Sequence, residues 1–72
     1  MDKYRYLVER QVGFTDDGTP LWYIEISGDS SWTKPTTSST GGAICDGSLC
    51  LESDTGSWFA WNEKASSWKE LG

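Results

Sequence analysis

The sequence predicts an all-β protein, a small twisted antiparallel sheet of about five strands in one domain, residues 1–72. Three observations support this prediction. Apolar and polar residues alternate with the two-residue period of a strand. Short groups of Gly, Asp, Asn and Pro separate the apolar segments, as turns do. Apolar residues nowhere recur with the spacing that a helix needs in order to pack on a core.

Residues 3–27 are predicted to form a β-hairpin. Residues 15–20 contain turn formers, and residues 21–27 are rich in aromatic and β-branched types. Pro20 has no N–H for a ladder, so it suits the first position of a strand. Alternation in the first strand places Tyr4, Tyr6, Val8, Val12 and Phe14 on one side and Arg5, Leu7 and Glu9 on the other.

Residues 28–42 read as a loop of Ser, Thr and Gly in which Trp32 is the only large apolar residue. A loop of this length in a small domain is usually functional or mobile. Three interpretations stay open: a surface arm, a docking segment, or a crossover to the second half of the sheet.

Residues 43–72 are predicted to form a β-meander, with three strands between Gly47 and Gly72. Leu49 and Leu51 share one face of its first strand. Gly56 ends a tight turn, where a positive φ suits glycine. In the following strand Trp58 faces away from Phe59 and Trp61.

Charge and hydropathy argue against two classes of partner, nucleic acids and membranes. The net charge is −5 with no His, and the six basic residues do not cluster, so we expect no direct binding to nucleic acid. No apolar run approaches the ~18 residues of a membrane span, and no signal peptide is recognisable. We therefore expect neither membrane insertion nor a secretory signal.

Cys45 and Cys50 are the only cysteines. Without His they cannot complete a zinc set, so no metal site is expected. A Cys45–Cys50 disulfide would need a turn at Asp46 and Gly47, whereas a reducing compartment would leave two free thiols. Both alternatives stay open.

No enzymatic activity and no cofactor are predicted. Glu52 and Asp54 have the residue types of a carboxylate pair, but they flank a turn where solvated acids are common. Neither cysteine has a His to form the thiolate, and no glycine-rich loop opens a helix to hold phosphate.

The aromatic residues are the candidates for an interface. Five Trp, three Tyr and two Phe are many for one thin sheet, which favours self-association or two packed sheets. Trp61 and Trp68 are assigned to the core. The residues that could meet a partner, or stack on the sugar rings of a glycan, are Trp22, Trp32 and Trp58. Trp32 could equally pack back on the sheet.

The C-terminal segment resembles a hairpin motif of virion proteins from tailed bacteriophages. The motif consists of Gly47, the strand with Leu49 and Leu51, Thr55-Gly56, the aromatic strand Phe59-Ala60-Trp61, and Trp68. Tyr4-Arg-Tyr-Leu-Val-Glu and Leu21-Trp-Tyr-Ile-Glu also resemble small phage and prophage proteins. The longer turn at residues 62–67, Trp58 and the two cysteines depart from the motif.

This resemblance implies a non-enzymatic structural protein of the virion, a capsid decoration, head fibre or tail component made in the bacterial cytoplasm. Its expected partners are a phage capsid or tail protein, further copies of itself, or both. Two alternatives stay open: a carbohydrate-binding module that recognises a surface glycan, and a small acidic phage inhibitor of a host defence protein.

Overall fold

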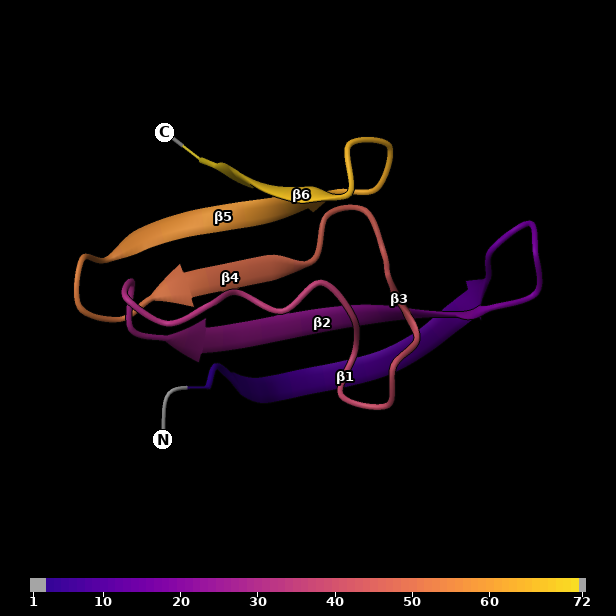
Figure 1. Cartoon of the computed structure of the whole chain (residues 1–72), viewed down its shortest axis with the longest axis horizontal. Coiled ribbons are helices and arrows are strands. Elements are labelled where there is room, and N and C mark those ends of the chain that lie inside the picture. The colour runs from indigo at the N-terminus through magenta and orange to yellow at the C-terminus, as the bar shows by residue number, and fades with distance from the viewer. Residues whose placement is uncertain (1–2, 72) are drawn as a thin grey trace.

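The computed structural model describes residues 3–71, so the ends of the predicted domain, residues 1–2 and 72, lie outside the described part. The described chain forms one sheet and contains no helix, which confirms the all-β prediction. The strand order is β1-β2-β4-β5-β6, and β3 pairs with β2 beside β4 (Figure 1). The strands are β1 (Arg5–Phe14), β2 (Pro20–Gly28), β3 (Ala43–Ile44), β4 (Leu49–Glu52), β5 (Ser57–Asn62) and β6 (Ser67–Glu70).

The N-terminal hairpin forms as predicted. β1 and β2 pair antiparallel, and Pro20 is the first residue of β2. Asp17 organises the connecting loop, because its carboxylate accepts hydrogen bonds from the Thr15 hydroxyl and from the backbone N–H and hydroxyl of Thr19. These bonds hold the pKa of Asp17 below its usual value. Gly18 has a φ of 89°, which few other residues adopt.

The predicted alternation of β1 is wrong beyond Tyr6. Tyr6 pairs with Ile26, but the next paired residue is Val8, opposite Glu25, so Leu7 is an extra residue in the ladder. A bulge of this kind moves the following side chains to the other face of the sheet. A second irregularity lies between Gln11 and Gly13.

The C-terminal meander is also present. β4, β5 and β6 pair antiparallel in sequence order, and Gly56 has a φ of 76° in the first turn. On β5, Phe59 and Trp61 point toward the core while Trp58 lies on the opposite face. Trp61 packs edge-on against its cross-strand neighbour Trp68, with ring centroids 5.1 Å apart.

The sheet is mixed, whereas the sequence predicted an antiparallel one. β2 pairs in parallel with both β3 and β4, which lie one after the other along it. Parallel neighbours need a long connection that returns the chain to the same end of the sheet. Residues 29–42 provide this connection, so the crossover interpretation of the loop applies.

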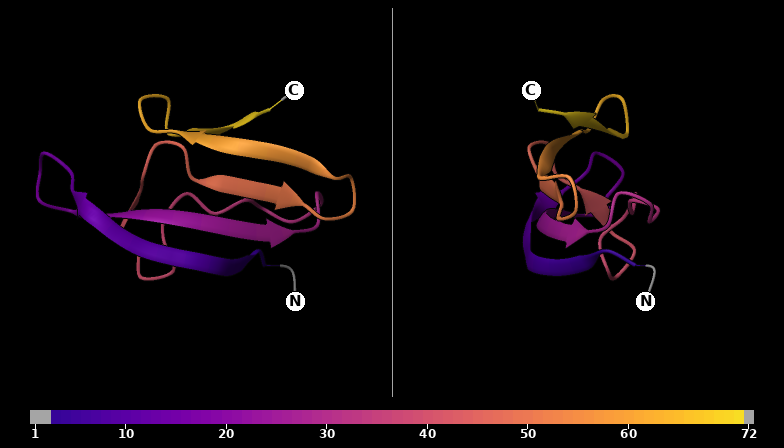
Figure 2. Two further views of the ribbon diagram at one scale, coloured as in Figure 1. Left: turned by 180° about the vertical axis from the view of Figure 1, so that it is seen from behind. Right: turned by 90° about the vertical axis from the view of Figure 1, so that its left-hand side faces the viewer.

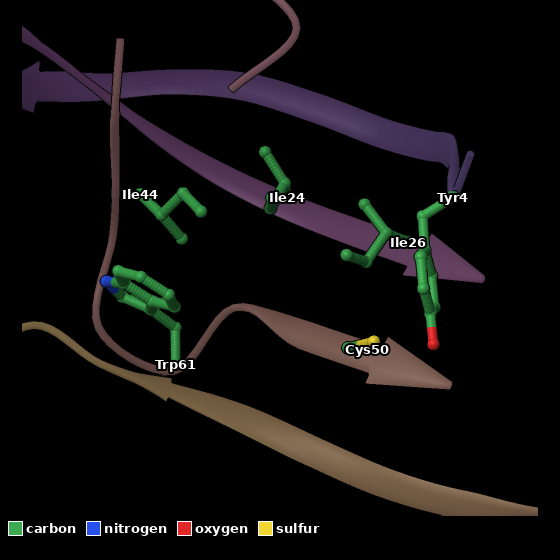
Figure 3. Packing of buried hydrophobic residues seen from close by; sticks show 6 residues of the cluster. All are labelled: Tyr4, Ile24, Ile26, Ile44, Cys50 and Trp61. Atoms are coloured by element: carbon green, nitrogen blue, oxygen red, sulfur yellow. The ribbon is translucent and has the colours of Figure 1, made fainter. Parts of the chain in front are cut away.

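The crossover packs on one face of the sheet, which we call the covered face; the opposite one is the open face. The crossover lies in front of β2 in Figure 1 and behind it in the left view of Figure 2, so it stays on one side of the sheet. Polar contacts to both edge strands help to fix it. Trp68 Nε1–H donates to the Pro35 carbonyl (2.8 Å), the Tyr6 hydroxyl donates to the Thr37 carbonyl (2.9 Å), and the N–H and hydroxyl of Ser39 donate to the Glu9 carboxylate. The core lies between the two layers and comprises Tyr4, Ile24, Ile26, Ile44, Cys50 and Trp61 (Figure 3).

Candidate interaction surface

The open face is the one large surface of the sheet that the described chain leaves without a second layer. Strand pairing assigns its residues to two cross-sheet rows. The central row runs Val8, Glu25, Leu49, Ala60, Lys69, and the Trp58 row runs Arg5, Ser27, Leu51, Trp58. The members of both rows on β4 and β5 are apolar, which is unusual for a sheet face in contact with water.

Trp58 is the most prominent residue of this face. Its side chain is 44% exposed, and its cross-strand neighbour Leu51 is half-buried. Leu49 and Ala60, in the adjacent row, are also half-buried, although no segment of residues 3–71 forms a layer over them. The four side chains therefore form a continuous apolar strip across β4 and β5. Contiguous exposed apolar surface on a small protein usually marks an interaction site.

Charged groups flank the apolar strip. The Glu25 carboxylate accepts a hydrogen bond from the Tyr23 hydroxyl (2.7 Å), and this bond is the main reason that the pKa of Tyr23 is raised. The Arg10 guanidinium lies 5.4 Å from the centre of the Tyr23 ring. Lys69, at the far end of the central row, is exposed. An acid and a base thus lie on opposite sides of the strip.

The other two candidate tryptophans contact the core. Trp22 is half-buried, and an added Cβ on Gly42 would lie 2.6 Å from its ring, so the crossover passes directly against it. Trp32 packs edge-on against Tyr4, with centroids 6.2 Å apart. Of the two alternatives for Trp32, the structure has it packed back on the sheet. Trp58 is exposed, whereas Trp22 and Trp32 are half-buried.

Both cysteines are free thiols. Cys50 is fully buried in the core, and this burial raises the pKa of its thiol to about 11. The Cys45 thiol is half-buried and donates to the Asp46 carbonyl (3.3 Å); desolvation raises its pKa too. Thiols with raised pKa values are poor nucleophiles at neutral pH.

The two acids of the β4–β5 turn have structural contacts. Glu52 forms an ion pair with Lys34 of the crossover (2.7 Å) and accepts a hydrogen bond from Thr55, and these bonds lower its pKa. Asp54 accepts two hydrogen bonds from Ser30, which lower its pKa as well. Both carboxylates thus fasten the crossover to the turn. In the described part of the chain, no group of three or more acidic, Cys or His side chains is placed to hold a metal ion.

Trp58 could be predicted from the sequence as a surface residue, but the rest of the open face could not. The spacing of Leu49 and Leu51 showed that they share a face, yet no local signal places that face beside Trp58. Glu25 and Lys69 join the surface only through the pairing of four strands. The described residues include no helix long and apolar enough to cross a membrane.

Comparison of the chain with protein-family models, curated proteins and solved structures finds no match.

Proposed function

We propose that this protein is a non-enzymatic structural component that acts by protein–protein assembly through its open face. The observation that carries the proposal is the asymmetry of the sheet. One face is covered by the chain's own crossover, whereas the other presents Trp58, 44% exposed, in an apolar strip. A sheet face of this kind is stabilised when a second layer removes it from water.

The energetics favour a protein partner. Removing apolar surface from water is favourable by about 25 cal/mol per Å², which offsets the entropic cost of association, and aromatic residues remove the most surface per side chain. Tryptophan is also among the residues that most often dominate binding energy at interfaces. Trp58, supported by Leu51 across the strand pair, has the position of such an anchor.

The resemblance of the C-terminal hairpin to virion proteins of tailed phages supports a particular setting for this assembly. We propose that the chain docks on the phage particle as a capsid decoration, a head fibre or a tail component. Its partner there is a capsid or tail protein, a further copy of the chain, or both.

Particle association tests the proposal. Virions from the source strain are purified on a density gradient and probed with an antibody to the chain. We expect the wild-type protein to co-migrate with particles and Leu51→Glu, which places a charge in the apolar strip, to remain unbound. Val12→Glu is the control, because it places the same charge at an apolar residue that is 48% exposed and lies on the edge strand β1.

Absence of the wild-type chain from purified particles would overturn the virion assignment. Saturable binding to defined sugars on a glycan array, lost in Trp58→Ala, would instead support the carbohydrate-binding alternative. Equal particle binding by Leu51→Glu and Val12→Glu would show that the open face is not the docking surface.

A further inference from the structure

We infer that the open face binds a second copy of this chain, face to face, about a twofold axis that runs parallel to the strands between β4 and β5. The inference rests on the proposed function, in that it takes the open face as the docking surface. It adds the identity of the partner and the register of the two sheets.

The symmetry follows from the order of the strands. A twofold rotation about an axis parallel to the strands keeps each cross-sheet row at its level and reverses its order. An axis between β4 and β5 therefore places β4 over β5 of the second copy and β2 over β6. β1 lies beyond the overlap, so its exposed residues Leu7, Val12 and Phe14 stay outside the interface.

This register brings apolar residues together at the centre. In the Trp58 row, Leu51 of each copy lies over Trp58 of the other, and in the central row Leu49 lies over Ala60. A larger side chain thus meets a smaller one in both rows. Sheets that pack face to face lie about 10 Å apart with interdigitating side chains, which these pairs permit.

The same register pairs the charges that flank the strip. Glu25 and Lys69 are the second and fifth members of the central row, so reversal places each over the other in the second copy. Within one copy they are separated by three strand spacings, about 14 Å, which is too far for an ion pair. Among residues 3–71 the only ion pair is Lys34–Glu52, so neither charge is already neutralised in this way.

The size of the overlap indicates a reversible dimer. Four strands spaced about 4.8 Å apart, most of them four to six residues long, overlap over roughly 300–400 Å² in plan. The surface buried by both copies is therefore about 600–800 Å², below the ~1,200 Å² of the smallest stable interfaces. We expect a dissociation constant on the order of 10 µM.

Sedimentation equilibrium from about 1 to about 500 µM tests the dimer. We expect wild type and Val12→Glu to pass from monomer to dimer over this range. Leu51→Glu should weaken the dimer by at least about thirtyfold while its circular dichroism and melting temperature stay close to wild type. A wild-type chain that remains monomeric at the highest concentration would overturn the inference.

A charge exchange tests the register. Lys69→Glu places like charges at both symmetric pairs and should weaken the dimer about tenfold. Adding Glu25→Lys restores opposite charges, so the double variant should recover most of the wild-type affinity. Lys64→Glu is the control for net charge, since Lys64 is an exposed residue of the β5–β6 turn. Failure of the double variant to recover would overturn this register.

The outcomes separate the two proposals. A monomer that still binds particles through Leu51 would refute self-pairing and leave the proposed function intact. A dimer that is disrupted by Leu51→Glu, with no chain on particles, would support self-pairing and refute the virion role.

Discussion

Trp58 and Trp61 lie three residues apart on β5 and face opposite sides of the sheet. Trp61 is 6% exposed and packs against Trp68 under the crossover, whereas Trp58 projects from the open face. The two residues therefore contribute to different free energies. Trp61 contributes to the free energy of folding, and we propose that Trp58 contributes to that of association.

Alanine substitution should separate these contributions. Trp61→Ala removes a buried ring and should cost about 3–5 kcal/mol, a large part of the roughly 4–11 kcal/mol expected for 72 residues. Trp58→Ala should change the unfolding free energy of the monomer by only ~0.5 kcal/mol but abolish most self-association. Urea melts at low concentration measure the first quantity. Equal destabilisation by both substitutions would contradict the assignment of Trp58.

Burial of Cys50 makes the free energy of unfolding depend on pH in the alkaline range. Its folded-state pKa of about 11 exceeds the value near 9 that it has when unfolded, so the unfolded state loses the proton first. Stability is therefore full below pH 9 and falls as the pH rises toward 11, by about 2 kcal/mol from this group. Unfolding free energies measured in reductant should show this slope in wild type and Cys45→Ala. Cys50→Ala should show a smaller slope, and an unchanged slope would contradict the prediction.

At the level of elements, the crossover 29–42 acts as the second layer of a two-layer protein. It has no strand, yet it supplies Trp32 to the core, buries Ser38 and pairs Lys34 with Glu52. Lys34 also lies 4.4 Å from the centre of the Phe59 ring. Polar residues and one tryptophan thus cover the core, as a helix or a second sheet does in other two-layer proteins.

Close packing of Tyr4 and Trp32 makes Gly28 intolerant of a side chain. A Cβ there would lie 2.8 Å from Tyr4 and 2.9 Å from Trp32, although the backbone itself does not require glycine. Gly28→Ala should therefore destabilise the fold by about 1–3 kcal/mol. Thermal melts would test this, with exposed Thr40→Ala as control. Equal melting temperatures of the two variants would show that the crossover is loosely packed.

The hairpin and the meander could be predicted from the sequence, but the pairing of the strands that connects them could not. The hairpin around Asp17-Gly18 and the meander around Gly56 follow from turn chemistry and alternation, which are local. The parallel pairing of Glu25 with Leu49 has no such signal, because it depends on the path of the crossover. The bulge at Leu7 was missed for the same reason: the alternation of β1 gives no sign of an extra residue.

At the level of the whole molecule, the sheet has two outer edges, β1 and β6. β1 is ten residues long, and an edge of that length invites pairing with another chain. Its irregularities at Leu7 and Val12 interrupt the row of outward N–H and C=O groups. The bulges therefore make β1 a poorer edge for pairing with another chain.

Hydrogen exchange should reveal this organisation. Amides of β2 and β4, which have strands on both sides, should exchange slowest, and outward amides of β1 and β6 should exchange fastest. Raising the protein concentration should leave the edge amides unprotected, because the proposed dimer pairs faces. Concentration-dependent protection along β1 would instead indicate edge-to-edge pairing.

The parallel pairing of β2 with β4 also has a consequence for the order in which the chain folds. The hairpin and the meander consist of contacts between near neighbours, which form fast, whereas the Ile24–Ser48 hydrogen bond that links them spans 24 residues. We therefore expect closure of the crossover to be a late step of folding. Until it closes, β2 and β4 each present a bare inner edge, and the meander of one chain can complete the hairpin of another. The crossover is thus also the hinge at which two chains would exchange halves.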